Sequence, residues 1–155
     1  MRITSNDEDD RKSFSGYCFF SDDKSAAITY SSKKQSLVAQ STMESETVAL
    51  SHAAKEALWL RQLCHDLHVF GDQESPTTPS IFMINSDSES ALKAIKNPVF
   101  HARTKHFDMR QHFIRDVVAK GVFSVGYIPG SAMDIFTKSL DHSKYSIALS
   151  LLHMA

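Results

Sequence analysis

Residues 41–67 read STMESETVALSHAAKEALWLRQLCHDL, and this stretch decides the fold. Ser41 and Glu44 match a capping box, in which a hydroxyl and a carboxylate satisfy two backbone amides where a helix begins. Apolar side chains then recur at steps of three and four residues or multiples of these, which places them on one stripe: Met43, Leu50, Ala53, Ala57, Leu60, Cys64 and Leu67. We therefore predict one long amphipathic helix that is buried along this stripe.

The segments on either side of this helix predict an α/β fold with a mixed sheet. Residues 14–21 and 26–30 are rich in aromatic and β-branched residues and predict a β-hairpin, while residues 31–36 are polar and predict a loop or strand end. Residues 81–84 are uniformly apolar, which is typical of a strand buried on both faces. Further along we expect helices over 88–96, 104–120 and 143–154, a strand over 122–128 and a short helical turn over 134–140. The order β-β-α-β-α-α-β-α implies a mixed sheet with helices packed on it.

Composition narrows the class of protein. The chain has 155 residues, 42% of them hydrophobic and 23% charged, as expected of one globular domain. Its formal net charge of -1 excludes a global basic field, so any binding of nucleic acid must use a local patch. Two cysteines, no secretory signal and no apolar run near the roughly 20 residues of a membrane span predict a cytoplasmic or nuclear protein that is not secreted and has no membrane partner.

Three carboxylates stand at positions where a ligand site could form. Glu46 lies four residues before Leu50 and so shares the inward stripe of the long helix. Asp87 follows the apolar strand, where open α/β sheets place their ligand sites. Asp134 opens a helical turn after Pro129 and Gly130. Each also has a structural interpretation: Glu46 could reach water from the edge of its stripe, Asp87 could cap a helix, and Asp134 could be a first-turn acid. Together they are the hard oxygen ligands that a divalent metal site needs.

A basic stretch lies between Lys93 and Arg115. It holds six lysine or arginine residues and one acid, Asp108, and three histidines interleave with them: His101, His106 and His112. Such a stretch could line a phosphate-binding groove, or it could be a solvated helix face. A zinc site built from these histidines is disfavoured, because their spacing matches no common ligand pattern and cysteines are absent nearby.

Several runs of the sequence resemble one known family. Residues 30–46, YSSKKQSLVAQSTMESE, residues 97–106, NPVFHARTKH, and residues 134–138, DIFTK, look like the characteristic runs of the ribonuclease H domain of copia-type LTR retrotransposon Pol polyproteins. The runs occur in the family's order, and the resemblance extends from Asp7 to about Leu152. It implies a ribonuclease H-like fold and a partner, the reverse transcriptase domain, in the parent polyprotein.

The resemblance also implies a reaction and its residues. Such domains hydrolyse the RNA strand of an RNA–DNA hybrid with two Mg²⁺ (or Mn²⁺) ions, for which Glu46, Asp87 and Asp134 match catalytic, metal-binding positions. The run after Glu46, Thr47-Val-Ala, fits the family pattern, whereas the run after Glu44 does not. Candidates for contacts with the nucleic-acid backbone are Lys33, Lys34, Lys93, Lys96, Arg103, Lys105, His106 and Arg110.

The sequence differs from the family pattern at its N-terminal end. The acidic positions of the family's first strand fall on Met1 and Ile3, so we expect an N-terminally truncated domain whose central first strand is largely missing. We expect a single domain over 1–155, with a remnant leader over 1–12, the family core over 13–142 and a terminal helix over 143–155. Three hypotheses follow: a ribonuclease H impaired by the missing aspartate, a non-catalytic remnant or recruited module that binds nucleic acid or protein, and a generic α/β domain unrelated to nucleases. The number of matching runs disfavours the third.

Overall fold

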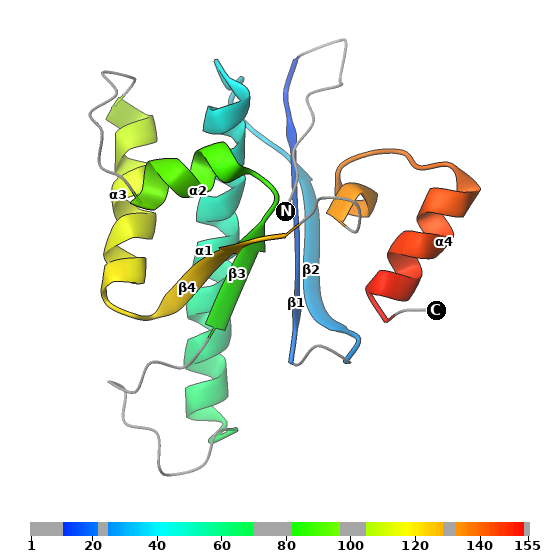
Figure 1. Cartoon of the computed structure of the whole chain (residues 1–155). Helices are drawn as coiled ribbons and strands as arrows, with labels where there is room; N and C mark the ends of the chain where they lie inside the picture. The colour runs from blue at the N-terminus through cyan, green and yellow to red at the C-terminus, as the bar shows by residue number, and fades with distance from the viewer. Residues whose placement is uncertain (1–10, 22–24, 70–81, 97–104, 129–132, 154–155) are drawn as a thin grey trace.

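The computed structural model describes residues 11–21, 25–69, 82–96, 105–128 and 133–153 (Figure 1). The elements follow the predicted order. They are β1 (Phe14–Phe20), β2 (Ala27–Lys34), α1 (Thr42–Asp66), β3 (Phe82–Ser86), α2 (Glu89–Lys96), α3 (Lys105–Ala119), β4 (Phe123–Tyr127), the 3₁₀ turn η1 (Met133–Phe136) and α4 (His142–Leu151).

The strands form two ladders of different kinds, which confirms the mixed α/β class. β1 and β2 pair as an antiparallel hairpin, whereas β3 and β4 pair in parallel. Within the described ranges no ladder joins β1 to β3. The expected stub of the family's central strand, residues 2–5, lies outside the described residues.

Helix α1 begins as the capping box predicts. The Ser41 hydroxyl accepts a hydrogen bond from the Glu44 amide at 3.2 Å, and the Glu44 carboxylate accepts one from the Gln40 amide at 2.7 Å. The usual partner in a capping box is the amide of the N-cap residue itself, one position later. Glu44 is therefore occupied at the helix end, and Glu46 takes the inward position.

The core forms where α1 meets the strands and α3. Four alanines of α1 lie in it, and their small size lets the helix approach its neighbours closely: Ala49, Ala53, Ala54 and Ala57. They pack with Leu50, Ile84, Ile95, Ile114, Val117 and Phe123. The predicted stripe is buried through Leu60, but Leu67 is exposed. The last turns of α1 thus extend past the core.

The hairpin separates two layers of helices. On one face α1 packs against it, with the Thr29 hydroxyl donating to the Glu56 carboxylate at 3.3 Å. On the other face lies η1, where the rings of Tyr30 and Phe136 are 6.2 Å apart and the Ser32 hydroxyl donates to the Phe136 carbonyl. A Cβ added at Gly16 would lie 2.3 Å from Cβ of Phe136, so this contact requires glycine. Figure 1 shows η1 and α4 on the side of the hairpin away from α1 and α3.

Two sequence expectations are corrected and one alternative is decided. Residues 31–34, expected to be a loop or strand end, form the end of β2, because they pair with β1. Strand β3 is buried on one face, since Ile84 and Ser86 turn inward while Met83 is 56% exposed. The helical turn expected over 134–140 ends at Phe136 and is a 3₁₀ turn.

Candidate functional site

Glu46 and Asp87 line the same pocket. Glu46 projects from the second turn of α1 and is only 8% exposed, while Asp87 follows β3 directly and is half-buried. Thr42, Ser88, Glu89, Ser90 and Tyr127 complete the lining. The pocket therefore opens at the carboxyl ends of β3 and β4, where α/β folds bind ligands.

Ser88, and not Asp87, caps the next helix. The Ser88 hydroxyl accepts a hydrogen bond from the Ala91 amide at 3.3 Å, and its carbonyl accepts one from the Leu92 amide at 3.1 Å. These are the contacts of an N-cap residue. Of the two residues that could begin α2, the structure assigns the cap to Ser88.

Several pocket residues are missed by sequence reasoning. Tyr127 comes beside Asp87 through the parallel register, which pairs Ser86 with Tyr127. Glu89 lines the pocket and also forms an ion pair with Lys93, in which Oε2 of Glu89 lies 2.8 Å from Nζ of Lys93. No sequence signal announces Tyr127, because strand register depends on partners that lie far apart in the chain.

Asp134 does not line this pocket. It lies in η1, its backbone carbonyl accepts hydrogen bonds from the amides of Thr137 and Lys138, and its Oδ1 is 3.2 Å from Nζ of Lys138. Both side chains are largely buried. Within the described ranges no three His, Cys, Asp or Glu side chains gather closely enough to hold a metal ion. The three-carboxylate metal site stays a prediction.

The predicted nucleic-acid contacts fall on different surfaces. Lys33 and Lys34 are neighbours on β2 and so point to opposite faces of the hairpin. Lys93 pairs with Glu89, and Lys96 is exposed at the end of α2. Arg103 lies outside the described residues, as do the side chains of Lys105 and His106.

Arg115, at the end of the basic stretch, is structural. Its guanidinium donates to the carbonyls of Ile95 and Ala94, at 3.2 and 2.5 Å, and so caps the carboxyl end of α2. A cation at this helix end is also favoured by the helix dipole. Within the described residues, the basic stretch therefore combines a packing role at Arg115 with exposed lysines at positions 93 and 96.

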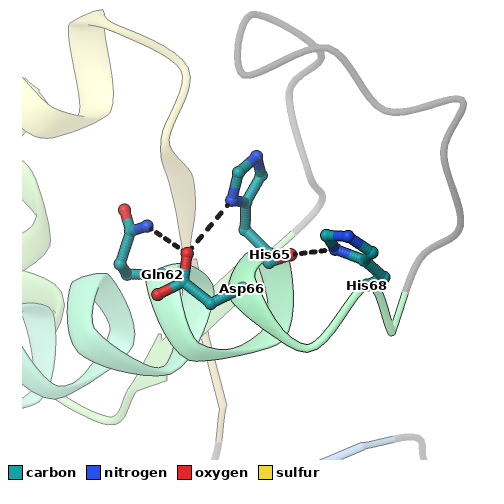
Figure 2. A network of polar contacts seen from close by, with 4 residues as sticks. All are labelled: Gln62, His65, Asp66 and His68. Carbon is teal, nitrogen blue, oxygen red and sulfur yellow. Dashed lines mark hydrogen bonds and ion pairs between the residues drawn. The ribbon is translucent and has the colours of Figure 1, made fainter.

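A polar network closes the far end of α1, away from the pocket. Figure 2 shows Gln62 Nε2 donating to Asp66 Oδ1 at 2.8 Å, with Nδ1 of His65 3.3 Å from the same oxygen. Nδ1 of His68 lies 3.1 Å from the His65 carbonyl. The pKa of Asp66 is lowered mainly by the hydrogen bond from Gln62 and then by that from His65. These groups are exposed and satisfy one another at a helix end.

The fold and the pocket define a mixed α/β domain with a carboxylate-lined pocket at the carboxyl edge of a parallel strand pair. None of the helices within the described ranges has the length and apolar character to cross a membrane. No protein-family model matches the sequence, and no solved structure matches the fold.

Curated relatives point to a particular source. The chain is 35% identical, over 96% of its length, to the retrovirus-related Pol polyprotein from transposon TNT 1-94 of Nicotiana tabacum. It is 31% and 32% identical, over 90% and 86% of its length, to those from transposons RE1 and RE2 of Arabidopsis thaliana. It spans about a tenth of each relative's length: 10%, 9% and 9%. The chain is thus homologous to a segment of plant transposon Pol polyproteins, which supports a retroelement origin.

Proposed function

We propose that this chain is the ribonuclease H segment of a copia-type Pol polyprotein, which hydrolyses the RNA strand of RNA–DNA hybrids with divalent metal ions. The observation that carries the proposal is the meeting of Glu46 and Asp87 in one pocket. These residues come from separate elements, and the resemblance to the family had selected both on sequence grounds.

The pocket's donor groups are of the kind that suits magnesium. Mg²⁺ takes oxygen ligands and is usually bound through one or two carboxylates while it keeps several waters. Glu46 and Asp87 would supply those carboxylates, and the hydroxyls of Thr42 and Ser88 could orient bound water. Bound metal would activate the attacking water and stabilise the leaving oxygen.

Hydrogen bonds within the chain hold the elements that form this pocket in place without a ligand. Gln35 donates from Nε2 to the Ser45 carbonyl at 2.9 Å and to the Ser15 hydroxyl at 2.8 Å, which fixes the first turns of α1 against the hairpin. Ser88 holds the start of α2. Rigid support of this kind keeps a site within the narrow geometry that catalysis needs.

We expect weak activity if Met1 and Ile3 occupy the family's first acidic positions, because neither side chain has a carboxylate. The family's first acidic positions fall on Met1 and Ile3, outside the described residues. Loss of one essential electrostatic group typically costs about 10²-fold or more in rate. Asp134, the third matched carboxylate, would have to leave or share its ion pair with Lys138 to reach a metal.

Hybrid cleavage with Mg²⁺ tests the proposal. The chain is compared with a version that carries an Asp-bearing strand fused before Met1, and Glu46→Gln and Asp87→Asn are made in both. Glu44→Gln is the matched control, because Glu44 lies two residues before Glu46 on α1 but serves the cap. We expect the fused version to cleave, both site variants to abolish cleavage, and the control to retain it. Cleavage that survives both site variants would refute the proposal.

A non-catalytic module that binds nucleic acid or protein is the second candidate. It is favoured by the pairing of Asp134 with Lys138, and by the lack of three close ligand groups within the described ranges. If the fused version folds and binds hybrid but never cleaves it, this candidate replaces the first.

A further inference from the structure

The outer side of α1 carries a row of polar and aromatic groups outside the pocket. His52, Lys55 and Trp59 are spaced three and four residues apart, so they lie on one side of the helix. Lys55 is exposed and Trp59, the single tryptophan of the chain, is 56% exposed.

Strand β2 adds Lys33 to this row. The Thr29 hydroxyl donates to Glu56 of α1, so the Thr29 side of β2 faces that helix. Alternation along the strand puts Ser31 and Lys33 on the same side. Beyond Lys33, Gln35 reaches the Ser45 carbonyl, so Lys33 lies beside the part of α1 between Ser45 and Glu56. His52 belongs to that part.

Helix α3 adds Arg110. It packs along α1, and Figure 1 shows α3 and the hairpin on opposite sides of α1. Arg110 is partly exposed, and its charge acts on the His52 ring. Groups from three elements thus form one basic stripe, which we define as Lys33, His52, Lys55 and Arg110.

The charges of the stripe act together on the His52 ring. The pKa of His52 is lowered, first by burial and then by the charges of Arg110, Lys55 and Lys33. The nearest acid on α1, Glu56, is turned to the hairpin, where it accepts from Thr29 and helps to raise the pKa of Tyr17 on β1. Like charges held this close repel one another, and an anion bound among them would relieve that repulsion.

We propose that this basic stripe binds the phosphate backbone of a nucleic-acid strand, with the Trp59 indole against a sugar or base. The inference rests on the proposed function, because the RNA–DNA hybrid is the ligand. The stripe is separate from the pocket: His52 lies six residues after Glu46, which is about 9 Å along the helix axis and roughly 120° around it. It therefore holds a part of the strand away from the cleaved bond.

Trp59 fluorescence reports binding at the stripe directly. The full chain is titrated with an RNA–DNA hybrid of about 18 base pairs, in EDTA to prevent cleavage, at several salt concentrations. The test variant carries Lys33→Gln with Lys55→Gln. The control carries Lys120→Gln with Lys144→Gln, which removes the same charge from exposed lysines that pair with Asp116 and Asp141 elsewhere.

We expect the hybrid to change Trp59 emission, and the test variant to reduce the slope of log K against log salt by about 1.8, since each phosphate contact contributes about 0.9. The control should keep the slope of the unmodified chain. An equal loss in both variants, or no loss in the test variant, overturns the proposal. A response to anionic phospholipid vesicles at phosphate concentrations where the hybrid has no effect also overturns it.

Acidification gives a second readout. Binding should strengthen on acidification, when His52 gains a proton. Because burial and the neighbouring charges lower its pKa, this gain should fall below the pH range usual for a histidine, and His52→Ala should lose that part of the pH dependence. Glu46→Gln separates this inference from the proposed function. It should abolish cleavage in the fused version while leaving the Trp59 response intact, whereas loss of both together contradicts a separate stripe.

Discussion

Gln35 joins the hairpin to the start of α1, and its truncation should cost more stability than its size suggests. The side chain is only 3% exposed and donates twice from Nε2, to the Ser15 hydroxyl and to the Ser45 carbonyl. Its backbone amide donates to the Ser13 carbonyl at 2.8 Å, which the substitution Gln35→Ala leaves in place. The perturbation therefore removes two buried side-chain hydrogen bonds and little else.

The magnitude follows from these contacts. Each buried neutral hydrogen bond contributes about 1 kcal/mol net, and unsatisfied partners add to the loss. With the packing of the side-chain stem included, we expect Gln35→Ala to lower the free energy of unfolding by about 2–3 kcal/mol. Gln62→Ala is the matched control, because Gln62 makes one exposed hydrogen bond to Asp66. Such a pair is worth about 0.2–0.5 kcal/mol, and the higher helix propensity of alanine offsets part of it.

Urea unfolding followed by far-ultraviolet circular dichroism measures both variants. The reasoning is refuted if Gln35→Ala loses less than about 1 kcal/mol, or no more than Gln62→Ala, at an unchanged m value. Gln35→Glu sharpens the test because it keeps the shape. Its loss should be larger at pH 7, where the carboxylate cannot donate to the Ser45 carbonyl, than at pH 4, where the protonated acid can.

Three further predictions concern other parts of the molecule. Arg115→Met should destabilise the chain by about 1.5–3 kcal/mol, because it leaves the last carbonyls of α2 without their charged donor. The control for thermal unfolding is Lys120→Met, which removes an exposed ion pair worth at most about 1 kcal/mol, and equal losses in the two variants would contradict the prediction. Burial raises the pKa of Cys18 to about 11. In a Cys64→Ser variant, Cys18 should therefore react with a disulfide reagent at pH 8 about 10²-fold more slowly than a small thiol, and the rate should rise up to about pH 11. A rate that reaches a plateau near pH 9 would be inconsistent with this burial. Hydrogen bonds from the Lys144 amide and then the Ser143 hydroxyl lower the pKa of Asp141 to about 2. The cap of α4 should therefore persist from neutral pH down to about pH 4 and be lost as the pH falls to about 2. An NMR titration of Asp141 with a midpoint near 4 would disprove this prediction.

Sequence alone determined the features that depend on neighbours along the chain. The start of α1 at Ser41, the place of Glu46 on the same side of the helix as Leu50, and the order of the elements all follow from local hydrogen bonding and apolar periodicity. These interactions join residues within four positions of one another, so a single sequence contains the information for them. The same logic left Asp87 undecided, because both Asp87 and Ser88 satisfy the local rule for a helix cap.

Tertiary structure decided how the elements meet. The register of β3 and β4 brought Tyr127 to the Asp87 pocket. The packing of α3 on α1 placed Arg110 where its charge acts on the His52 ring. Each of these outcomes depends on strand register and helix packing between distant segments, and local preferences do not encode those distances.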